Sequence, residues 1–380
     1  MKKKKVMFFI YQMGSGGAAR TLLNILNHMN EHEFEPILVT LNFNGNYETY
    51  LKSNIKFIKL DTKRLRSAII PLAKLIRKER PHIVFSTIPV YNTVAIFGRL
   101  LSFTKTKNIV REAALLGGSF RENISLRIFG LIYRFASKVI SLSEGVKKNL
   151  INRYNVKEKN IQVIYNPIDL DKIQHLANYG KILEKHHYIF EKDASIIVTA
   201  GRLVKEKDHF TLIRAFANVN KHINSELLIL GEGELEHQLK SLAKDLGIKQ
   251  KVHFIGFQQN PYIYFKRADL FVLSSVNEGF GHVLVESLAV GTPVVSTNCK
   301  PGAEEVLMDG KFGRICQVGD VDGLANSMYE TLMMPEYEKK KVIKRGITRA
   351  KDFDAKVIVK QYEETFNQVI GEKNRHRQRS

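Results

Sequence analysis

The sequence contains very little cysteine and no long apolar run, and each absence excludes a class of protein. Cys299 and Cys316 are the only cysteines in 380 residues, which argues against a disulfide-stapled scaffold and favours two reduced thiols in a cytosolic protein. The longest uncharged run, residues 83–98, includes the polar Ser86 and Asn92 and is shorter than the roughly 18 apolar residues that a membrane span requires. With 44% hydrophobic and 26% charged residues, the chain is neither disordered nor collagen-like.

The N-terminus resembles a secretion signal only over its first residues. Lys2–Lys5 precede an apolar stretch at residues 6–11, but that stretch is short, and a glycine-rich segment follows where further apolar residues would be needed. We therefore expect the protein to stay in the cytoplasm. Its length of 380 residues exceeds what one hydrophobic core usually serves, so two domains are expected.

Acidic residues are scarce in the first half of the chain only. Residues 1–165 contain 28 lysines and arginines against 10 acidic residues, a surplus of 18, whereas residues 166–380 contain 31 against 28, a surplus of 3. Charge that serves general solubility would be spread over both halves. The asymmetry therefore predicts an anionic partner for the first half, such as nucleic acid, an anionic membrane surface or a polyphosphate-containing acceptor.

Short β-branched runs alternate with amphipathic helical patterns from one end of the chain to the other. The alternation predicts an α/β fold of two doubly wound, Rossmann-like domains that face each other across a cleft. Ligands of such sheets bind beyond the carboxyl ends of the strands, so we expect the site there. The expected strands are residues 6–11, 35–41, 55–60, 83–86, 108–111, 139–142, 162–165, 195–200, 226–230, 252–256, 270–274 and 293–297.

The domain boundary is expected after Asn166-Pro167, where the sequence becomes polar and weakly periodic. We predict a first domain at residues 1–166, a linker at residues 167–193 and a second domain at residues 194–354.

The strongest motif, E-G-F-G-H-V-L-V-E, runs from Glu278 to Glu286 and lies between an apolar strand and a helix. Gly279 and Gly281 let the backbone approach a ligand closely, and the helix start offers free N–H groups to phosphate. Glu286 can accept two hydrogen bonds from a vicinal diol such as a ribose. Two carboxylates near a helix N-terminus are also favourable without any ligand.

A second motif, G-R-L-V-K-E-K at residues 201–207, also lies between a strand and a helix. Gly201 permits a tight turn, while Arg202 and Lys207 place two cations at the carboxyl edge of the sheet. A diphosphate leaving group needs such neutralisation where no metal supplies it. Alone, the segment is more typical of a solvated basic loop, but together the two motifs predict a pocket for a nucleotide diphosphate.

Gly16 and Gly17 belong to a third and weaker motif, G-S-G-G-A-A-R at residues 14–20. Its spacing matches neither a dinucleotide fingerprint nor a Walker loop, but a bare backbone turn at this edge can face phosphates or an acceptor. The histidines lack metal-ligand spacing, so we expect no metal and no cofactor. His282 is instead expected to line the pocket for the donor sugar.

These segments resemble the family-4 retaining glycosyltransferases of GT-B fold, above all the bacterial polysaccharide-assembly members. Further segments carry the resemblance: S-E-G-V at residues 143–146, Y-N-P-I-D at 165–169, L-G-E-G at 230–233 and G-A-E-E-V-L at 302–307. It covers nearly the whole chain and is densest over residues 195–325. It implies metal-independent transfer with retention of anomeric configuration. It also implies a last helix, residues 355–370, that crosses back onto the first domain before a basic tail at residues 371–380.

The resemblance also implies a role for each motif residue. Arg202 and Lys207 match the pair that binds the donor diphosphate, Glu286 matches the carboxylate that holds the nucleotide ribose, and Glu278 matches the one near the transferred sugar. The backbone of the glycine-rich turns would meet the sugar and phosphates, at Gly279, Phe280 and Gly281 on one side and at Gly16 and Gly17 on the other.

Two departures from the family pattern affect the acceptor side. The glycine loop has Ala19 where the family usually has a glutamate before Arg20, and the strand at residues 108–111 leads into Arg111-Glu112 where many members have a histidine. Arg111 and Glu112 are therefore acceptor-side candidates, with a purely structural role at a strand end as the equal alternative.

Together these patterns predict a glycosyltransferase that uses a nucleotide-diphosphate sugar, foremost a UDP-sugar, in polysaccharide and cell-envelope biosynthesis. We expect a glycan, lipid-linked or wall-polymer acceptor and a peripheral position on the inner face of the membrane. Basic amphipathic segments at residues 63–80 and 121–138 fit an anionic membrane surface, or they pack on the sheet with their charges in water. The alternatives are an epimerase or phosphorylase of the same fold, or a non-catalytic nucleic-acid-binding protein. The last lacks any base-reading motif.

Overall fold

The computed structural model describes residues 3–14 and 16–377 and divides the chain into two compact units. The first unit comprises Met1–Pro167 and Ala355–Ser380, and the second comprises Ile168–Asp354. The segment expected as a linker, residues 167–193, contains helices α6 (Leu170–Tyr179) and α7 (His187–Phe190) and belongs to the second unit from Ile168 onward. No helix within the described residues is long and apolar enough to cross a bilayer.

The first unit is built on a seven-stranded parallel sheet with strand order β3-β2-β1-β4-β5-β6-β7. The chain moves outward from β1 in one direction and then from β4 in the other, so the sheet is doubly wound and its connections reverse between β1 and β4. The strands are β1 (Lys4–Phe9), β2 (Phe34–Leu41), β3 (Lys56–Leu60), β4 (Ile83–Thr87), β5 (Lys107–Glu112), β6 (Lys138–Ser141) and β7 (Ile161–Val163).

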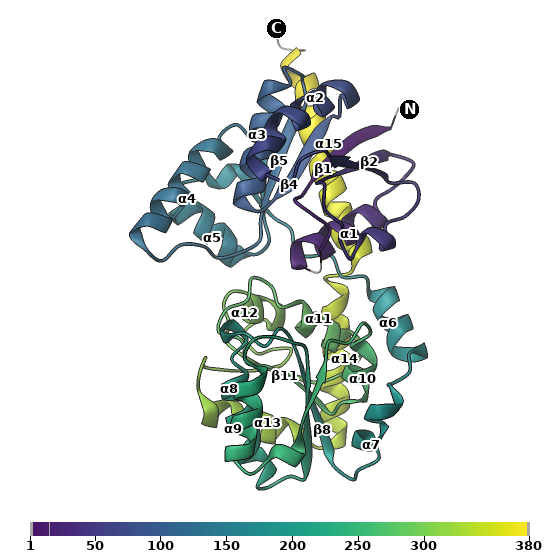
Figure 1. Cartoon of the computed structure of the whole chain (residues 1–380), viewed down its shortest axis with the longest axis vertical. Coiled ribbons are helices and arrows are strands. Elements are labelled where there is room, and N and C mark those ends of the chain that lie inside the picture. The colour runs from purple at the N-terminus through teal and green to yellow at the C-terminus, as the bar shows by residue number, and fades with distance from the viewer. Residues whose placement is uncertain (1–2, 15, 378–380) are drawn as a thin grey trace. The chain divides into compact units, whose positions relative to one another are not determined.

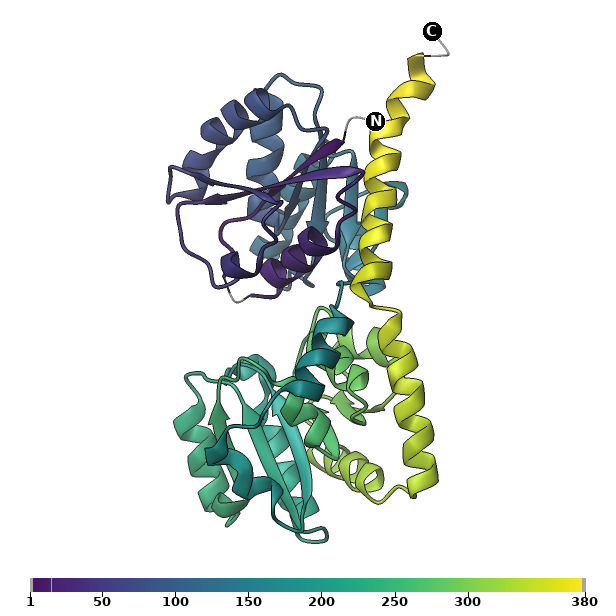
Figure 2. The ribbon, with the colours of Figure 1, turned by 90° about the vertical axis from the view of Figure 1, so that its right-hand side faces the viewer.

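Strict alternation along β1 explains how both faces of this sheet are covered. Val6 and Phe8 pack against helices α1 (Gly17–His28) and α15 (Ala355–Arg377), while Met7 and Phe9 pack against α2 (Ile69–Glu79) and α3 (Pro89–Leu101). Figure 2 shows α15 along one face of the sheet. Helices α4 (Phe120–Tyr133) and α5 (Glu144–Asn152) complete the other face with α3.

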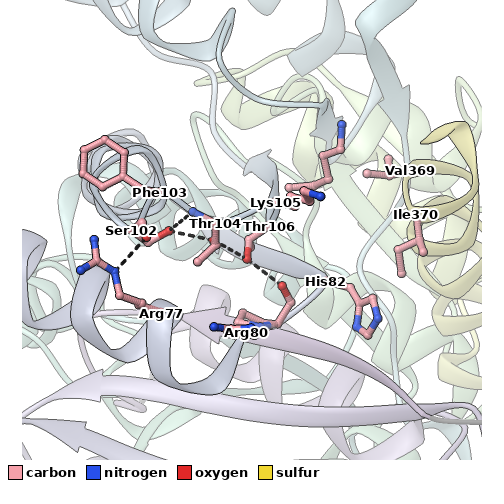
Figure 3. A pocket seen from close by; sticks show the side chains of 12 residues that line it. Arg77, Arg80, His82, Ser102, Phe103, Thr104, Lys105, Thr106, Val369 and Ile370 are labelled. Atoms are coloured by element: carbon pink, nitrogen blue, oxygen red, sulfur yellow. Dashed lines mark hydrogen bonds between the residues drawn. The ribbon is translucent and has the colours of Figure 1, made fainter. Parts of the chain in front are cut away.

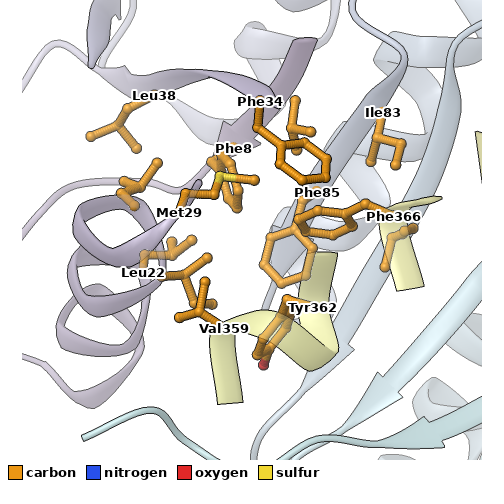
Figure 4. Close-up of a cluster of buried hydrophobic side chains, with 14 of the residues drawn as sticks. Phe8, Leu22, Met29, Phe34, Leu38, Ile83, Phe85, Val359, Tyr362 and Phe366 are labelled. Carbon is orange, nitrogen blue, oxygen red and sulfur yellow. The ribbon is translucent and has the colours of Figure 1, made fainter. Parts of the chain in front are cut away.

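The last helix is part of the hydrophobic core of the first unit. The ring of Phe366 lies 6.0 to 6.2 Å from the rings of Phe8, Phe34 and Phe85, as Figure 4 shows. These are edge-on aromatic contacts, which add to the energy of apolar burial. Residues near both ends of the chain therefore form one hydrophobic core.

The second unit is built on a six-stranded parallel sheet with strand order β10-β9-β8-β11-β12-β13, and its connections reverse between β8 and β11. Its strands are β8 (Ser195–Ala200), β9 (Ser225–Leu230), β10 (Val252–Gly256), β11 (Leu270–Leu273), β12 (Val294–Thr297) and β13 (Arg314–Cys316). Helices α8 (His209–Asn220), α9 (Glu236–Asp245) and α13 (Val321–Leu332) cover one face. The remaining helices are α10 (Tyr262–Arg267), α11 (His282–Ala289), α12 (Gly302–Leu307) and α14 (Glu336–Lys351), all visible in Figure 1.

The predicted fold class is confirmed, and each expected strand corresponds to an observed strand within two residues. The sequence did not indicate β13. This strand has only three residues, is half-exposed and pairs with a single neighbour, β12. Its hydrophobic pattern is therefore too short to be recognised in the sequence.

Candidate active site

The two strongest motifs meet where the connections of the second sheet reverse. β8 and β11 are hydrogen-bonded neighbours, with Leu270 paired to Ile197. One motif begins at Gly201, directly after β8, and the other follows β11 through Ser274 and Ser275. In doubly wound sheets, the carboxyl ends of the strands at this reversal form the usual ligand site. The fold therefore selects the same residues as the sequence motifs.

Lys207 and Glu278 form an ion pair at this edge, between the lysine Nζ and the carboxylate Oε1. The hydroxyl of Ser275 donates to the same Oε1 over 2.8 Å. Both charged side chains are largely shielded, with 22% and 16% of their surface exposed. Lys207 of the G-R-L-V-K-E-K motif therefore holds the Glu278 carboxylate of the other motif in one orientation.

Backbone contacts hold the two loops together. The hydroxyl of Ser274 donates to the carbonyl of Lys207 over 2.8 Å, and the N–H of Val276 donates to the carbonyl of Glu206 over 2.8 Å. Arg202 is different, because its side chain is exposed and has no ion-pair or hydrogen-bond partner among the residues that the structure describes. Its guanidinium remains available to a ligand.

Close backbone approaches explain two glycines of this edge. Gly231 has φ of +143°, and a Cβ there would lie 1.9 Å from the carbonyl oxygen of Gly201. A Cβ on Gly302 would lie 2.7 Å from the backbone of Phe280, and the N–H of Gly302 donates to the carbonyl of Glu278 over 2.9 Å. Only glycine fits such contacts. The L-G-E-G and G-A-E-E-V-L segments thus position the loops that carry Arg202 and Glu278.

The turn after Glu278 begins helix α11. Gly281 is its N-cap with φ of +79°, a conformation that favours glycine. The half-buried Gly279 precedes Phe280, which is buried and packs edge-on against Phe353 at 5.2 Å between ring centroids. His282 is half-buried beside Phe280, at 5.5 Å between ring centroids. Glu286 lies on α11 and is 1% exposed.

Gly16 and Gly17 lie at the carboxyl end of β1 in the first unit, where α1 begins. Gly16 is the N-cap of α1 with an ordinary φ of −81°. Both glycines are exposed, and a Cβ at either position would have no atom within 4 Å. Neither packing nor backbone strain therefore demands glycine here. Ser15, between them and Gly14 in the motif, lies outside the described residues.

An unusual backbone conformation lies at the corresponding reversal point of the first sheet. Ile88, at the end of β4, has φ of +78°, which β-branched residues rarely adopt and which costs about 1–3 kcal/mol. Its carbonyl accepts from the N–H of Asn92 over 2.9 Å, and Pro89 begins α3. No sequence pattern indicated this strain, since the residue before proline is normally extended.

Arg111 lies in a buried network and is 1% exposed. Its guanidinium donates to the amide oxygen of Asn166, to the hydroxyl of Tyr362 over 3.1 Å and to the hydroxyl of Thr87 over 3.3 Å. It joins β5, β4, the segment after β7 and the last helix. These contacts favour the structural alternative over a direct role in acceptor binding.

Glu112 is also buried, on the other face of β5. Its Oε1 accepts from the hydroxyl of Tyr133 and from the amide of Asn92 over 2.9 Å. Burial raises the pKa of the Glu112 carboxyl to about 7, against the opposing effects of these hydrogen bonds and of the charge on Arg111. Its position too favours a structural role.

The raised pKa of Glu112 predicts a pH-dependent stability. The folded protein keeps this proton to a higher pH than the unfolded chain, so the stabilisation is complete below about pH 4.5 and declines as the pH rises to about 7. The free energy of unfolding of Glu112→Gln, relative to that of the wild type, should be higher at pH 8 than at pH 4.5 by on the order of 3 kcal/mol. Urea denaturation at both pH values measures this. The prediction would be contradicted if the variant and the wild type differed by the same free energy of unfolding at both pH values. The control is Glu206→Gln, which changes an exposed carboxylate.

Sequence reasoning missed Ser275 and the direct pairing of Lys207 with Glu278. Ser274 and Ser275 directly follow an apolar strand and precede the E-G-F-G motif. This position at the carboxyl end of a strand could have identified them as candidates in the sequence. The pairing was not predictable, because 71 residues separate the two charges and only the strand order brings them together.

Comparison with known proteins shows the family to which the chain belongs. Residues 15–172 match the family model described as Glycosyltransferase Family 4, and residues 182–349 match the one described as Glycosyl transferases group 1. The N-acetylgalactosamine-N,N'-diacetylbacillosaminyl-diphospho-undecaprenol 4-alpha-N-acetylgalactosaminyltransferase of Campylobacter jejuni is 32% identical, covering 92% of this chain and 96% of that protein. The capsular polysaccharide biosynthesis glycosyltransferase CapM of Staphylococcus aureus is 28% identical, covering 80% and 81%.

Solved structures show the same fold. Anabaena Alr3699/HepE, crystallised with UDP, superposes with a TM-score of 0.81 at 20% identity and covers 96% of this chain and 100% of its own. Two Rossmann-like units with motif residues at the carboxyl edges of their sheets define a glycosyltransferase of GT-B fold. The chain belongs to glycosyltransferase family 4.

Proposed function

We propose that the protein transfers a sugar, with retention of anomeric configuration, from a nucleotide diphosphate donor to a glycan, lipid-linked or wall-polymer acceptor in cell-envelope polysaccharide biosynthesis. The observation that carries the proposal is the cluster at the reversal point of the second sheet. There Arg202 is exposed and has no partner among the residues that the structure describes, while Lys207 is paired with Glu278. Two cations at this edge suit a diphosphate, and a nearby carboxylate suits sugar hydroxyls.

Relatives support a UDP-sugar and a membrane-bound acceptor. The HepE structures were solved with UDP and with UDP-glucose. The C. jejuni relative is named for an acceptor linked to diphospho-undecaprenol, and CapM is named for capsular polysaccharide. For this chain we infer a UDP-sugar as the donor and a lipid-linked or polysaccharide acceptor.

In the proposed reaction, the bond between the sugar C1 and the leaving phosphate oxygen breaks as the acceptor hydroxyl oxygen bonds C1 on the same face. The acceptor proton passes to the leaving phosphate. Lys207 and Arg202 stabilise the charge that develops on that phosphate, so the reaction needs no metal. Glu286 holds the nucleotide ribose, and Glu278 orients the transferred sugar.

This mechanism predicts a product of the same anomeric configuration as the donor, formed at an undiminished rate in excess chelator. Proton NMR of the product gives the configuration from the coupling at C1, using a panel of UDP-, GDP- and ADP-sugars. An inverted product would contradict the proposal, as would activity that chelator abolishes and added metal restores. A sugar trapped covalently on Glu278 would replace front-face attack by a nucleophilic mechanism.

We further propose that the enzyme docks on the cytoplasmic face of an anionic membrane through the outer surface of α3 and α4. The expected basic amphipathic segment at residues 121–138 does pack on the sheet, through Leu126 and Tyr133. Its outer side is nevertheless apolar. Four large apolar side chains of α4 lie within an arc of about 80° at 3.6 residues per turn: Phe120, Ile124, Ile128 and Leu131, between 45% and 81% exposed. The exposed Phe135 follows in the turn after the helix.

Arginines flank this apolar stripe on both sides. Arg121 lies along one edge, and Arg127 and Arg134 lie along the other, at the helical spacing of 3.6 residues per turn, and all three are exposed. The neighbouring α3 has exposed side chains only at Val90, Phe97 and Leu101 among its residues. An apolar surface edged by arginine suits an anionic bilayer interface, and the surplus of positive charge in residues 1–165 adds to the attraction.

A further inference from the structure

The first unit contains a basic pocket at the opposite edge of its sheet from Gly16 and Gly17. The pocket encloses about 670 Å³ at the amino ends of β4 and β5, between the loop at residues 102–107 and helix α15, as Figure 3 shows. None of the lining residues that the structure describes is acidic. Its permanently charged side chains are Arg77, Arg80, Lys105 and Lys107.

A chain of hydroxyl groups fixes the loop that carries both lysines. The hydroxyls of Ser102 and Thr104 lie 2.9 Å apart, that of Thr104 donates to Thr106 over 2.9 Å, and that of Thr106 donates to the carbonyl of Pro81 over 2.7 Å. Figure 3 shows this chain along the pocket wall. Because the loop is anchored at each hydroxyl, it can hold its lysines at the pocket without a ligand.

Within the described part of the chain, no carboxylate pairs with any of the four cations. Arg77 donates from Nε to the carbonyl of Ser102 over 3.1 Å, and its guanidinium lies 5.9 Å from the ring centroid of Phe103, which leaves its terminal nitrogens available. The neighbouring carboxylate, Glu79, pairs with Lys56 at 2.7 Å. Clustered and uncompensated cations favour an anionic ligand.

His82 adds a neutral hydrogen-bond donor to the pocket. Its Nδ1 lies 3.0 Å from the backbone N–H of Lys5 and accepts a hydrogen bond from it, so the ring proton is on Nε2. A donor of this kind serves a phosphate oxygen without changing the charge of the site.

One part of the pocket is apolar. Val369 and Ile370 line it from α15, and the ring of Phe103 lines it with 83% of that residue exposed. Phe103 follows α3 almost directly, so this apolar part of the pocket lies beside the C-terminal end of α3. Inorganic phosphate alone would leave these apolar side chains unused.

We propose that this pocket binds a phosphate-bearing amphiphile, a lipid whose phosphate meets Arg80, Lys105 and Lys107 while its apolar part lies along Phe103. The pocket belongs to the first unit, whereas the proposed donor site consists of residues of the second unit. The pocket then anchors the enzyme to individual lipid molecules and plays no part in the transfer step.

Titration calorimetry with dihexanoyl phosphatidic acid, kept below its micelle-forming concentration, tests the proposal on the full chain. The background is Lys207→Ala, so that phosphate binding at the proposed donor site is weakened equally in every protein compared. The test variant is Arg80→Asn with Lys105→Ser, where asparagine tolerates the left-handed backbone of residue 80 (φ +49°). The matched control is Lys74→Ser with Lys78→Asn, which removes two exposed cations of α2 outside the pocket.

We expect one binding site for phosphatidic acid, at least tenfold weaker affinity in the test variant and unchanged affinity in the control variant. Inorganic phosphate should bind at least tenfold more weakly, and dihexanoyl phosphatidylcholine should not bind measurably. Equal affinity in the two double variants would overturn the site, and equal affinity for phosphate and phosphatidic acid would overturn its amphiphile specificity. None of these outcomes depends on the identity of the sugar donor.

Discussion

Lys207→Ala and Glu286→Gln should each lower kcat/KM for the donor by about ten- to a hundredfold while the protein stays folded. Each loses a charge-assisted contact to the bound donor, worth about 1.5–3 kcal/mol. Lys207→Ala also removes the partner that orients Glu278, which leaves that carboxylate with the Ser275 hydroxyl. Initial rates over a range of donor concentrations measure the effect.

Lys205→Ala is the matched control for Lys207→Ala. Lys205 lies in the same short turn, Lys205–Lys207, is exposed, and has no ion-pair partner among the described residues. Its loss should change the rate less than twofold. Equal losses in both lysine variants would mean that only the general charge of the loop matters, and wild-type rates in Lys207→Ala and Glu286→Gln would remove the proposed site.

Charged substitutions in the apolar stripe of α4 should weaken membrane binding. The double substitution Ile128→Glu with Leu131→Glu should weaken binding to anionic vesicles at least tenfold. It removes two half-exposed apolar side chains from the docking surface, each worth about 1 kcal/mol, and adds two negative charges that cost about 1 kcal/mol each near the lipid. Co-sedimentation with vesicles of varied anionic content measures the binding. Raising the salt from about 0.1 M to about 1 M should also weaken it, since the Debye length falls from about 10 Å to about 3 Å.

The control introduces the same charges elsewhere, as Met333→Glu with Tyr337→Glu, two similarly exposed apolar residues of the second unit. It should bind vesicles nearly as well as the wild type. If the wild type binds neutral and anionic vesicles equally, or binds neither, its basic residues serve only to solvate the surface and the acceptor is a soluble one.

The fold was largely predictable because its signals are local. Central strands such as β4 and β8 are buried on both faces and appear as short apolar runs, and the amphipathic helices repeat their apolar residues every three to four positions. The motif positions were also predictable, since glycine and charged residues directly after a buried strand mark the carboxyl edge of the sheet. Arg202, Lys207 and Glu278 were found in this way.

Features that depend on long-range packing were not predictable. Arg111 stands at a strand end like the motif residues, yet it bonds to Asn166 and Tyr362, which lie 55 and 251 residues away. Nothing near Arg111 in the sequence distinguishes a buried guanidinium from a ligand-binding one. The same holds for the apolar stripe of α4, because an exposed and a buried apolar face have the same helical spacing.

We propose that the second unit binds the nucleoside diphosphate of the donor through Lys207 and Glu286. Titration calorimetry of UDP, GDP and ADP into the wild type and into Lys207→Ala tests it without knowledge of the sugar or the acceptor. We predict that one nucleotide, foremost UDP, binds with a stoichiometry of one and that Lys207→Ala weakens it by ten- to a hundredfold. Absence of binding by all three nucleotides, or equal affinity in the wild type and the variant, would contradict the account.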